Sequence, residues 1–257
     1  MVYYFNTTYN NMFHYTTESI LPIIHTLPKL TANDTIIVPN FKTYPFDLIK
    51  KIIGKCKMEK KEAINPRINS EHYKPIFYGK DVKKCCNVLI SHIEKKPVKS
   101  PSIYMSFRLH KRRWLPITNI QTLINKLKDK YTILLSLNPK CENIENIPNF
   151  TGATKIYDLS YEEQLSYAAS ANYSIYGNGA GMIFPKIAGL SGIMITPCLI
   201  TEEMSVGSYY KTDEIVLSDK KPDHKKQWND DIEKVTVAQV LESFNKLTKS
   251  NIYNNEN

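Results

Sequence analysis

Apolar runs of strand length alternate with segments of helical periodicity through the second half of the chain. Strands are expected over 102–106, 131–137, 154–157, 173–176 and 192–196, and helices over 117–130, over 161–170 and around Lys186. The connections are long enough to hold crossover helices, which indicates a parallel sheet covered on both faces. Ligands of such sheets bind beyond the carboxyl ends of the strands.

The pattern of the first part of the chain is less regular. Helices are expected over part of 12–30, over 45–53 and over 81–94, with a buried strand over 35–39 and a candidate strand over 74–78. Pro22 is expected to bend or restart the first helix. The basic stretch 54–72 is interpreted as a surface loop.

A polar segment with two prolines, 95–101, is the best linker candidate. It divides the chain into an N-terminal domain, 1–98, and a C-terminal domain, 99–257. The length of 257 residues suits two small domains or one large one. The final helix, 237–247, is expected to belong to the second domain or to cross back to the first, and 251–257 is interpreted as a frayed tail.

The composition describes an ordinary globular protein. Hydrophobic residues make up 42% and charged residues 23% of the chain, which excludes a disordered protein. The net charge of +9 favours a polyanionic or phosphorylated partner, although a lysine-rich composition alone gives the same value. Five cysteines without Cys-x-x-Cys spacing argue against a disulfide framework and a structural zinc site. With no signal peptide or membrane-spanning run in the sequence, a cytoplasmic protein is expected.

Three alternate glycines follow the expected strand 173–176. They are Gly177, Gly179 and Gly181, separated by Asn178 and Ala180. Glycine allows the backbone to turn tightly and to approach a ligand, and a helix after the turn presents N–H groups to an anion. The motif alone is a weak signal, because a tight strand-to-helix turn without a ligand has the same sequence.

Basic and amide side chains are the next candidates for a ligand site. Arg108, Arg112 and Arg113 follow the first strand of the second domain, where guanidinium groups can grip a diphosphate bidentately. The alternative is a solvated basic turn. Asn119 is interpreted as a substrate contact or as the cap of the next helix, and Gln164 as a substrate contact or an exposed helix residue.

An imidazole and a carboxylate share one face of the first expected helix. His14 and Glu18 are four residues apart, so their side chains are neighbours. Such a pair can act as a general base on a hydroxyl group. It can equally be an ordinary surface pair, and the sequence leaves both interpretations open.

Taken together and in this order, three stretches resemble glycosyltransferase family 61. They are His14-Tyr-Thr-Thr-Glu18-Ser-Ile-Leu-Pro22, then Ser106-Phe-Arg108 with Arg112, Arg113 and Asn119, and finally Glu163-Gln164 with Gly177-Asn-Gly-Ala-Gly181. The family includes plant xylosyl- and arabinosyltransferases and O-linked N-acetylglucosaminyltransferases. The resemblance covers roughly residues 10 to 190, and its specificity lies in the order and spacing of modest motifs.

The resemblance implies an α/β protein of GT-B-like architecture, with two small Rossmann-like domains and parallel sheets. It implies an inverting glycosyltransferase that moves a sugar from a UDP-sugar, such as UDP-xylose or UDP-GlcNAc, to a glycan or protein hydroxyl. The first domain then holds the acceptor and the second the donor.

The same resemblance assigns roles to the candidate residues. The catalytic base is His14 or Glu18. The donor-binding residues are Arg108, Arg112, Arg113, Asn119, Gln164, Gly177, Asn178, Gly179, Ala180 and Gly181. No obligatory metal is expected, because arginines and a helix end can replace a cation, although the acidic residues Glu202, Glu203, Asp213 and Glu214 keep a divalent metal as an alternative.

This chain departs from the family pattern in three respects. Asn178 replaces the histidine that precedes Gly-Ala-Gly, so any role of that imidazole is in doubt. Trp114 and Pro116 lengthen the spacing between Arg113 and Asn119. The membrane anchor and luminal disulfides of eukaryotic members are missing, which fits a cytoplasmic enzyme of a virus, a microbe or a protist.

Two other functions use the same features. An S-adenosylmethionine-dependent methyltransferase binds its cofactor over Gly-x-Gly-x-Gly, but places that motif after the first strand and behind an acidic residue, where this chain has Tyr176. A non-enzymatic basic module would bind nucleic acid or an acidic glycan. No nucleic-acid-binding motif supports it, so no nucleic-acid partner is expected.

Overall fold

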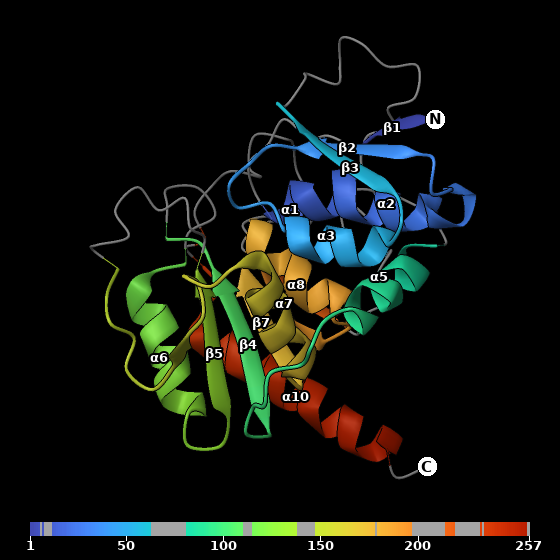
Figure 1. Cartoon of the computed structure of the whole chain (residues 1–257). Coiled ribbons are helices and arrows are strands. Elements are labelled where there is room, and N and C mark those ends of the chain that lie inside the picture. The colour runs from blue at the N-terminus through green and yellow to red at the C-terminus, as the bar shows by residue number, and fades with distance from the viewer. Residues whose placement is uncertain are drawn as a thin grey trace.

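The protein contains two separate parallel sheets (Figure 1). The computed structural model describes residues 1–5, 7, 12–62, 81–109, 115–137, 147–177, 179–196, 214–218, 232 and 234–255. A three-stranded sheet comes from the first part of the chain and a six-stranded sheet from the second. The α/β class with parallel sheets is therefore confirmed, and the expected boundary between residues 98 and 99 falls between the two sheets.

The N-terminal sheet has the strand order β1-β2-β3. Its strands are β1 (Val2–Tyr4), β2 (Thr35–Pro39) and β3 (Lys57–Lys61), and its helices are α1 (Met12–His14), η1 (Tyr15–Ile20), α2 (Leu21–Thr26), η2 (Leu27–Lys29) and α3 (Phe46–Ile53). The expectation of a loop over 54–72 is wrong for β3, which pairs with β2 along its whole length. The sequence of β3, Lys-Met-Glu-Lys-Lys, lacks the apolar alternation that reveals a strand.

The helical segment before β2 widens before it reaches Pro22. The turn η1 is a π-helix, in which the Leu21 amide bonds the Thr16 carbonyl five residues earlier. Because proline has no N–H group, Pro22 cannot donate the helical bond to the Glu18 carbonyl. Glu18 belongs to this wide turn. Turns of π-helix are frequent at functional sites.

The C-terminal sheet has the strand order β6-β5-β4-β7-β8-β9. Its strands are β4 (Ser102–Phe107), β5 (Thr132–Leu137), β6 (Thr154–Lys155), β7 (Tyr173–Gly177), β8 (Ser191–Thr196) and β9 (Glu214–Ser218). The chain starts in the middle of the sheet, proceeds to one edge, and then returns to build the other half. This is the doubly wound order, and the direction of travel reverses between β4 and β7.

Helices cover both faces of this sheet. They are α6 (Ile117–Leu127), α7 (Tyr161–Ser170), η4 (Ala180–Met182), α8 (Ile183–Ile187) and α10 (Val237–Asn255), and α5 (Val82–Ser91) precedes the sheet. α10 packs against β8, β9 and α6 of the same domain instead of crossing back. Its backbone remains helical to Asn255, where a frayed tail was expected. None of the described helices is long and apolar enough to cross a membrane.

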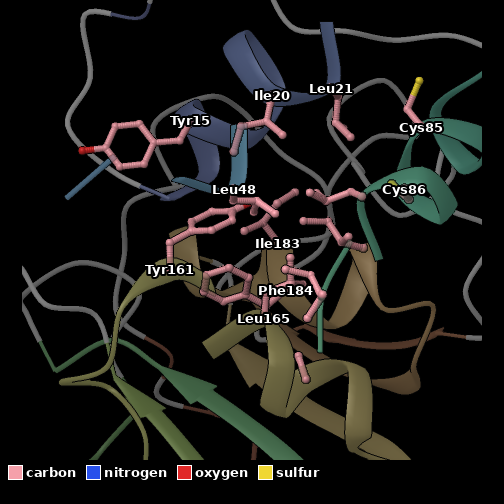
Figure 2. Packing of buried hydrophobic residues seen from close by; sticks show 14 of the residues in the cluster. Tyr15, Ile20, Leu21, Leu48, Cys85, Cys86, Tyr161, Leu165, Ile183 and Phe184 are labelled. Atoms are coloured by element: carbon pink, nitrogen blue, oxygen red, sulfur yellow. The ribbon is translucent and has the colours of Figure 1, made fainter. Parts of the chain in front are cut away.

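One continuous cluster of buried apolar side chains joins the two domains (Figure 2). Tyr15 and Leu48 enter it from the N-terminal domain, and Leu165 and Phe184 enter it from α7 and α8. The linker-side helix α5 contacts both α2 and α8. A second cluster fills the opposite face of the large sheet, beneath α6 and α10. The two domains therefore share a hydrophobic core.

Polar contacts reinforce this packing. The Thr16 and Tyr161 hydroxyl oxygens lie 2.6 Å apart in the interior, across the domains. At the surface, Lys51 Nζ donates to Glu162 Oε1 over 3.1 Å. Both contacts hold the beginning of α7 against the N-terminal domain.

Candidate functional site

Arg108 and the glycine turn follow neighbouring strands. β4 and β7 pair in parallel, with Ser106 opposite Tyr176. Arg108 comes directly after β4, and the turn begins where β7 ends at Gly177. Both therefore lie at the carboxyl edge of the sheet, on the two sides of the point where the strand order reverses, which is where open α/β sheets bind ligands.

The glycines allow close contact between this turn and the end of β4. A Cβ added to Gly179 would lie 3.1 Å from both Cγ and Cδ of Arg108, so the arginine side chain crosses directly over that glycine. A Cβ added to Gly181 would overlap the Ser106 hydroxyl oxygen. The turn is thus fitted closely against Arg108 and Ser106, and at Gly181 only glycine leaves room.

The helix that follows the turn is shorter than expected. The apolar run from Met182 to Leu190 forms the 3₁₀ turn η4 and then only the five-residue helix α8. The Met182 amide bonds the Gly179 carbonyl over 3.1 Å. A helix this short has only a small dipole, so it contributes little to binding an anion, and the role of Arg108 in binding one remains a prediction.

The N-terminal domain brings α1 to the same place. α1 packs against η4, although the two elements are far apart in the sequence. His14 is the last residue of α1. The helix that ends at His14 and the glycine turn therefore lie next to each other, at the junction of the two domains.

His14 and Glu18 form a close pair. The distance from His14 Nδ1 to Glu18 Oε1 is 2.5 Å, and Thr7 Oγ1 donates to Glu18 Oε2 over 2.5 Å. The Glu18 side chain is only 7% exposed and that of His14 23% exposed. An ordinary surface pair would be solvated, so the alternative of a surface pair does not fit this geometry, whereas a catalytic role for the pair remains a prediction.

Gln164 lies in the interior and not on an exposed helix face. Its Oε1 accepts from the Ser136 hydroxyl over 2.9 Å, and its Nε2 donates to the Leu159 carbonyl over 2.8 Å. Gln164 is fully buried, and it attaches α7 to the end of β5. Its amide is thus used within the protein, and a direct contact with a donor remains a prediction that these bonds do not favour.

Asn119 does not cap α6. The N-cap position of that helix is Pro116, which makes no side-chain cap bond, and Asn119 lies half-buried in the first turn. The remaining predicted residues that lie outside the described part of the chain are Arg112, Arg113, Asn178, Glu202, Glu203 and Asp213. The described residues contain no group of three His, Cys, Asp or Glu side chains placed to hold a metal ion.

The sequence analysis did not name two buried polar residues, Thr7 and Lys186, as candidate site residues. No sequence pattern indicates Thr7, because only the tertiary structure brings it to Glu18. Lys186 is buried in α8, and its Nζ lies 5.8 Å from the centre of the Tyr176 ring, next to Gly177. The sequence feature that could have indicated Lys186 is its position inside an apolar run.

Solved structures share this architecture. A glycosyl transferase of family 9 from Veillonella parvula DSM 2008 superposes with a TM-score of 0.59 at 9% identity, over 96% of this chain and 96% of that one. An E. coli ADP-heptose LPS heptosyltransferase II gives a TM-score of 0.55 at 8% identity, over 97% and 99% of the two chains. The UDP-GlcNAc 2-epimerase of Neisseria meningitidis, bound to UDP-GlcNAc, gives 0.56 at 10% identity, over 98% and 92%.

The chain has the GT-B fold. No protein-family model and no curated protein matches it. At these identities the structural likeness establishes the arrangement of the two domains and no more. The GT-B neighbours named above are a family 9 enzyme, a heptosyltransferase and an epimerase, so the resemblance to family 61 remains a prediction.

Proposed function

We propose that the protein is a nucleotide-sugar-dependent glycosyltransferase. The observation that carries the proposal is the packing of α1 against η4, with Arg108 lying across Gly179 in the same neighbourhood. A candidate base from one domain and a candidate diphosphate site from the other meet at the junction of a GT-B fold. Enzymes of this fold in the comparison act on nucleotide sugars, by their names.

The chemistry assigned to these residues is an inverting transfer. Arg108 and the backbone of the glycine turn bind the diphosphate, with Arg112 and Arg113 as further predicted contacts. The base takes the proton of an acceptor hydroxyl while its oxygen attacks the anomeric carbon. The bond from that carbon to the diphosphate breaks, and the leaving group departs with the electron pair, stabilised by the guanidinium charge.

The donor is proposed to be a UDP-sugar. UDP-xylose and UDP-GlcNAc come from the resemblance to family 61, and the structural neighbour bound to UDP-GlcNAc gives independent support for the second. The heptosyltransferase neighbour makes ADP-heptose the necessary third donor to test. The acceptor is proposed to be a glycan or protein hydroxyl, held against the N-terminal domain.

The decisive experiment compares ligand-induced thermal stabilisation in wild type and Arg108→Ala. UDP-xylose, UDP-GlcNAc or ADP-heptose is expected to raise the melting temperature of the wild type, and Arg108→Ala is expected to abolish the increase. Lys99→Ala is the matched control, because it removes an exposed positive charge just before the opposite end of β4. No increase with any of the three donors contradicts the proposal.

The structure also bears on the methyltransferase alternative. Those enzymes place the glycine motif after the first strand of the sheet, which is β4 in this domain, but here the motif follows β7. S-adenosylmethionine in the same assay is therefore expected to leave the melting temperature unchanged. Steeply salt-dependent binding of DNA or RNA, without binding of a nucleotide sugar, would instead support the basic binding module.

A further inference from the structure

The Glu18 carboxylate is hydrogen-bonded at both oxygens by side chains from separate segments. Oε2 accepts from the Thr7 hydroxyl and Oε1 contacts His14 Nδ1, each over 2.5 Å. Thr7 is completely buried and Glu18 nearly so. A buried carboxylate is costly unless it is hydrogen-bonded in this way, so the arrangement fixes the position of the Glu18 side chain.

The proton positions follow from what each group can donate. With Glu18 ionised, its carboxylate only accepts hydrogen bonds, and the hydrogen between Glu18 and His14 is then carried by Nδ1. A neutral imidazole has one N–H group, so Nε2 then carries none and is the basic nitrogen. The contact with Glu18 therefore selects the histidine tautomer.

The position of His14 makes it the member of this group that can reach a substrate. It is the most exposed of the three side chains and the last residue of α1, the helix that packs against the glycine turn. The edge of its ring meets the Phe13 ring, with centroids 5.4 Å apart, which limits its rotation. Glu18 and Thr7 lie deeper in the protein and support it from behind.

We propose that His14 is the general base of the transfer, acting through Nε2, and that Glu18 and Thr7 are positioning residues. This inference rests on the proposed glycosyltransferase function and decides between the two candidate bases. Nε2 accepts the proton of the acceptor hydroxyl as the new glycosidic bond forms and the bond to the diphosphate breaks. The Glu18 carboxylate stabilises the resulting imidazolium, which later releases its proton to solvent.

Among the described elements, η1 and η4 make extensive contacts with α1. η1 contributes Tyr15 and Glu18, whereas η4 contains no titratable side chain. The Tyr15 hydroxyl lies 2.7 Å from the Thr43 hydroxyl, and the Arg108 side chain packs against Gly179. Glu18 is a charged side chain that the structure places in direct contact with His14.

The first test needs no substrate. Nitrogen NMR of the full chain labelled with ¹⁵N-histidine, with His14→Gln for assignment, is expected to show neutral His14 protonated at Nδ1. Glu18→Gln is expected to lower the population of the Nδ1-protonated tautomer of the neutral ring, because the amide is a weaker acceptor than the carboxylate. A proton on Nε2 in the neutral ring, or a tautomer that is insensitive to Glu18→Gln, overturns the inference.

Thr7 is tested by an isosteric pair of variants. Thr7→Val removes the hydroxyl and keeps the shape, whereas Thr7→Ser keeps the hydroxyl. The Nδ1–H signal of His14 is expected to exchange faster with water in Thr7→Val and to be restored in Thr7→Ser. Equal signals in all three proteins, at equal melting temperatures, exclude a positioning role for Thr7.

The second test measures turnover with the donor that stabilises the wild type, chosen from UDP-GlcNAc, UDP-xylose and ADP-heptose. His14→Gln is expected to lower kcat for donor hydrolysis by about 10²- to 10⁴-fold, with unchanged donor affinity in calorimetry. Thr7→Val is expected to lower kcat but not to raise KM, and Thr7→Ser to restore kcat. If none of the donors binds, the proposed function itself fails. If the donor binds and His14→Gln keeps full turnover, only the present inference fails.

Discussion

The hydroxyl oxygen of Ser106 lies only 2.0 Å from the position that a β-carbon on Gly181 would take. Ser106 is the penultimate residue of β4, and Gly181 lies in the turn after β7. The two segments therefore touch at the point where the strand order reverses. The position of the glycine turn depends on this contact, and four predictions follow from it and from neighbouring contacts.

Gly181→Ala is expected to destabilise the protein by about 1 to 3 kcal/mol, the usual cost of overpacking a closed site. The double variant Ser106→Ala/Gly181→Ala is expected to recover most of the loss, because the overlapping oxygen is gone. Denaturant unfolding measures both. Gly177→Ala is the matched control, since its added Cβ would meet ordinary contacts at 3.7 Å or more. A double variant no more stable than Gly181→Ala contradicts the explanation.

Gly179→Ala is expected to affect binding more than stability. Its added Cβ would meet the flexible stem of Arg108 at 3.1 Å, and this side chain can move aside by a few tenths of an ångström. The guanidinium is then displaced from the turn. Calorimetry with UDP-GlcNAc, or with the donor that stabilises the wild type, should show weaker binding at a nearly unchanged melting temperature. An unchanged affinity for the donor would show that Arg108 is not part of the donor site.

Tyr161→Phe is expected to cost about 1 kcal/mol of unfolding free energy, as is usual for a lost buried hydrogen bond. The Thr16 hydroxyl donates to the Met12 carbonyl over 2.8 Å, so it accepts the hydrogen bond from Tyr161. A double-mutant cycle with Thr16→Val measures the coupling across the two domains. If the losses of unfolding free energy in the two single variants add up fully in the double variant, this hydrogen bond contributes nothing to the coupling between the domains.

Stability is expected to fall in alkali. Burial raises the pKa of the Tyr44, Tyr104 and Tyr161 hydroxyls above the ordinary value. The unfolded chain releases these protons at about pH 10, whereas the folded protein retains them, so the stabilisation is complete below that pH and is lost as the pH rises above it. Denaturant unfolding between pH 8 and 11 tests this, and Tyr161→Phe should reduce the slope.

The sequence predicted the central strands well and the outer strands poorly. β4, β5, β7 and β8 are covered on both faces, so they read as continuous apolar runs. β3 lies at an edge and is mostly charged, and its structure depends on pairing with β2. β1, which has only three residues, and β9 were not predicted either, whereas the edge strand β6 was.

The candidate site was predicted in its parts but not in its assembly. Glycines and Arg108 were placed at strand ends from the sequence, whereas the adjacency of those ends depends on the strand order, which local patterns do not contain. The contact of Thr7 with Glu18 depends on tertiary structure alone. Gln164 was interpreted as a substrate contact or an exposed helix residue, because its partner Ser136 lies on another element and cannot be recognised from the sequence.

The apolar cluster that joins the domains has a consequence for how the proposed glycosyltransferase would work. Swinging the halves apart would bring Tyr15, Leu48, Phe184 and their neighbours into water, at about 1.5 to 3 kcal/mol for each large side chain. The relative placement of His14 and the glycine turn is therefore built into the resting protein and does not wait for a ligand to assemble it. Under the proposed function, reactants that bind there would find their orientation already set, which would lower the entropic part of the barrier.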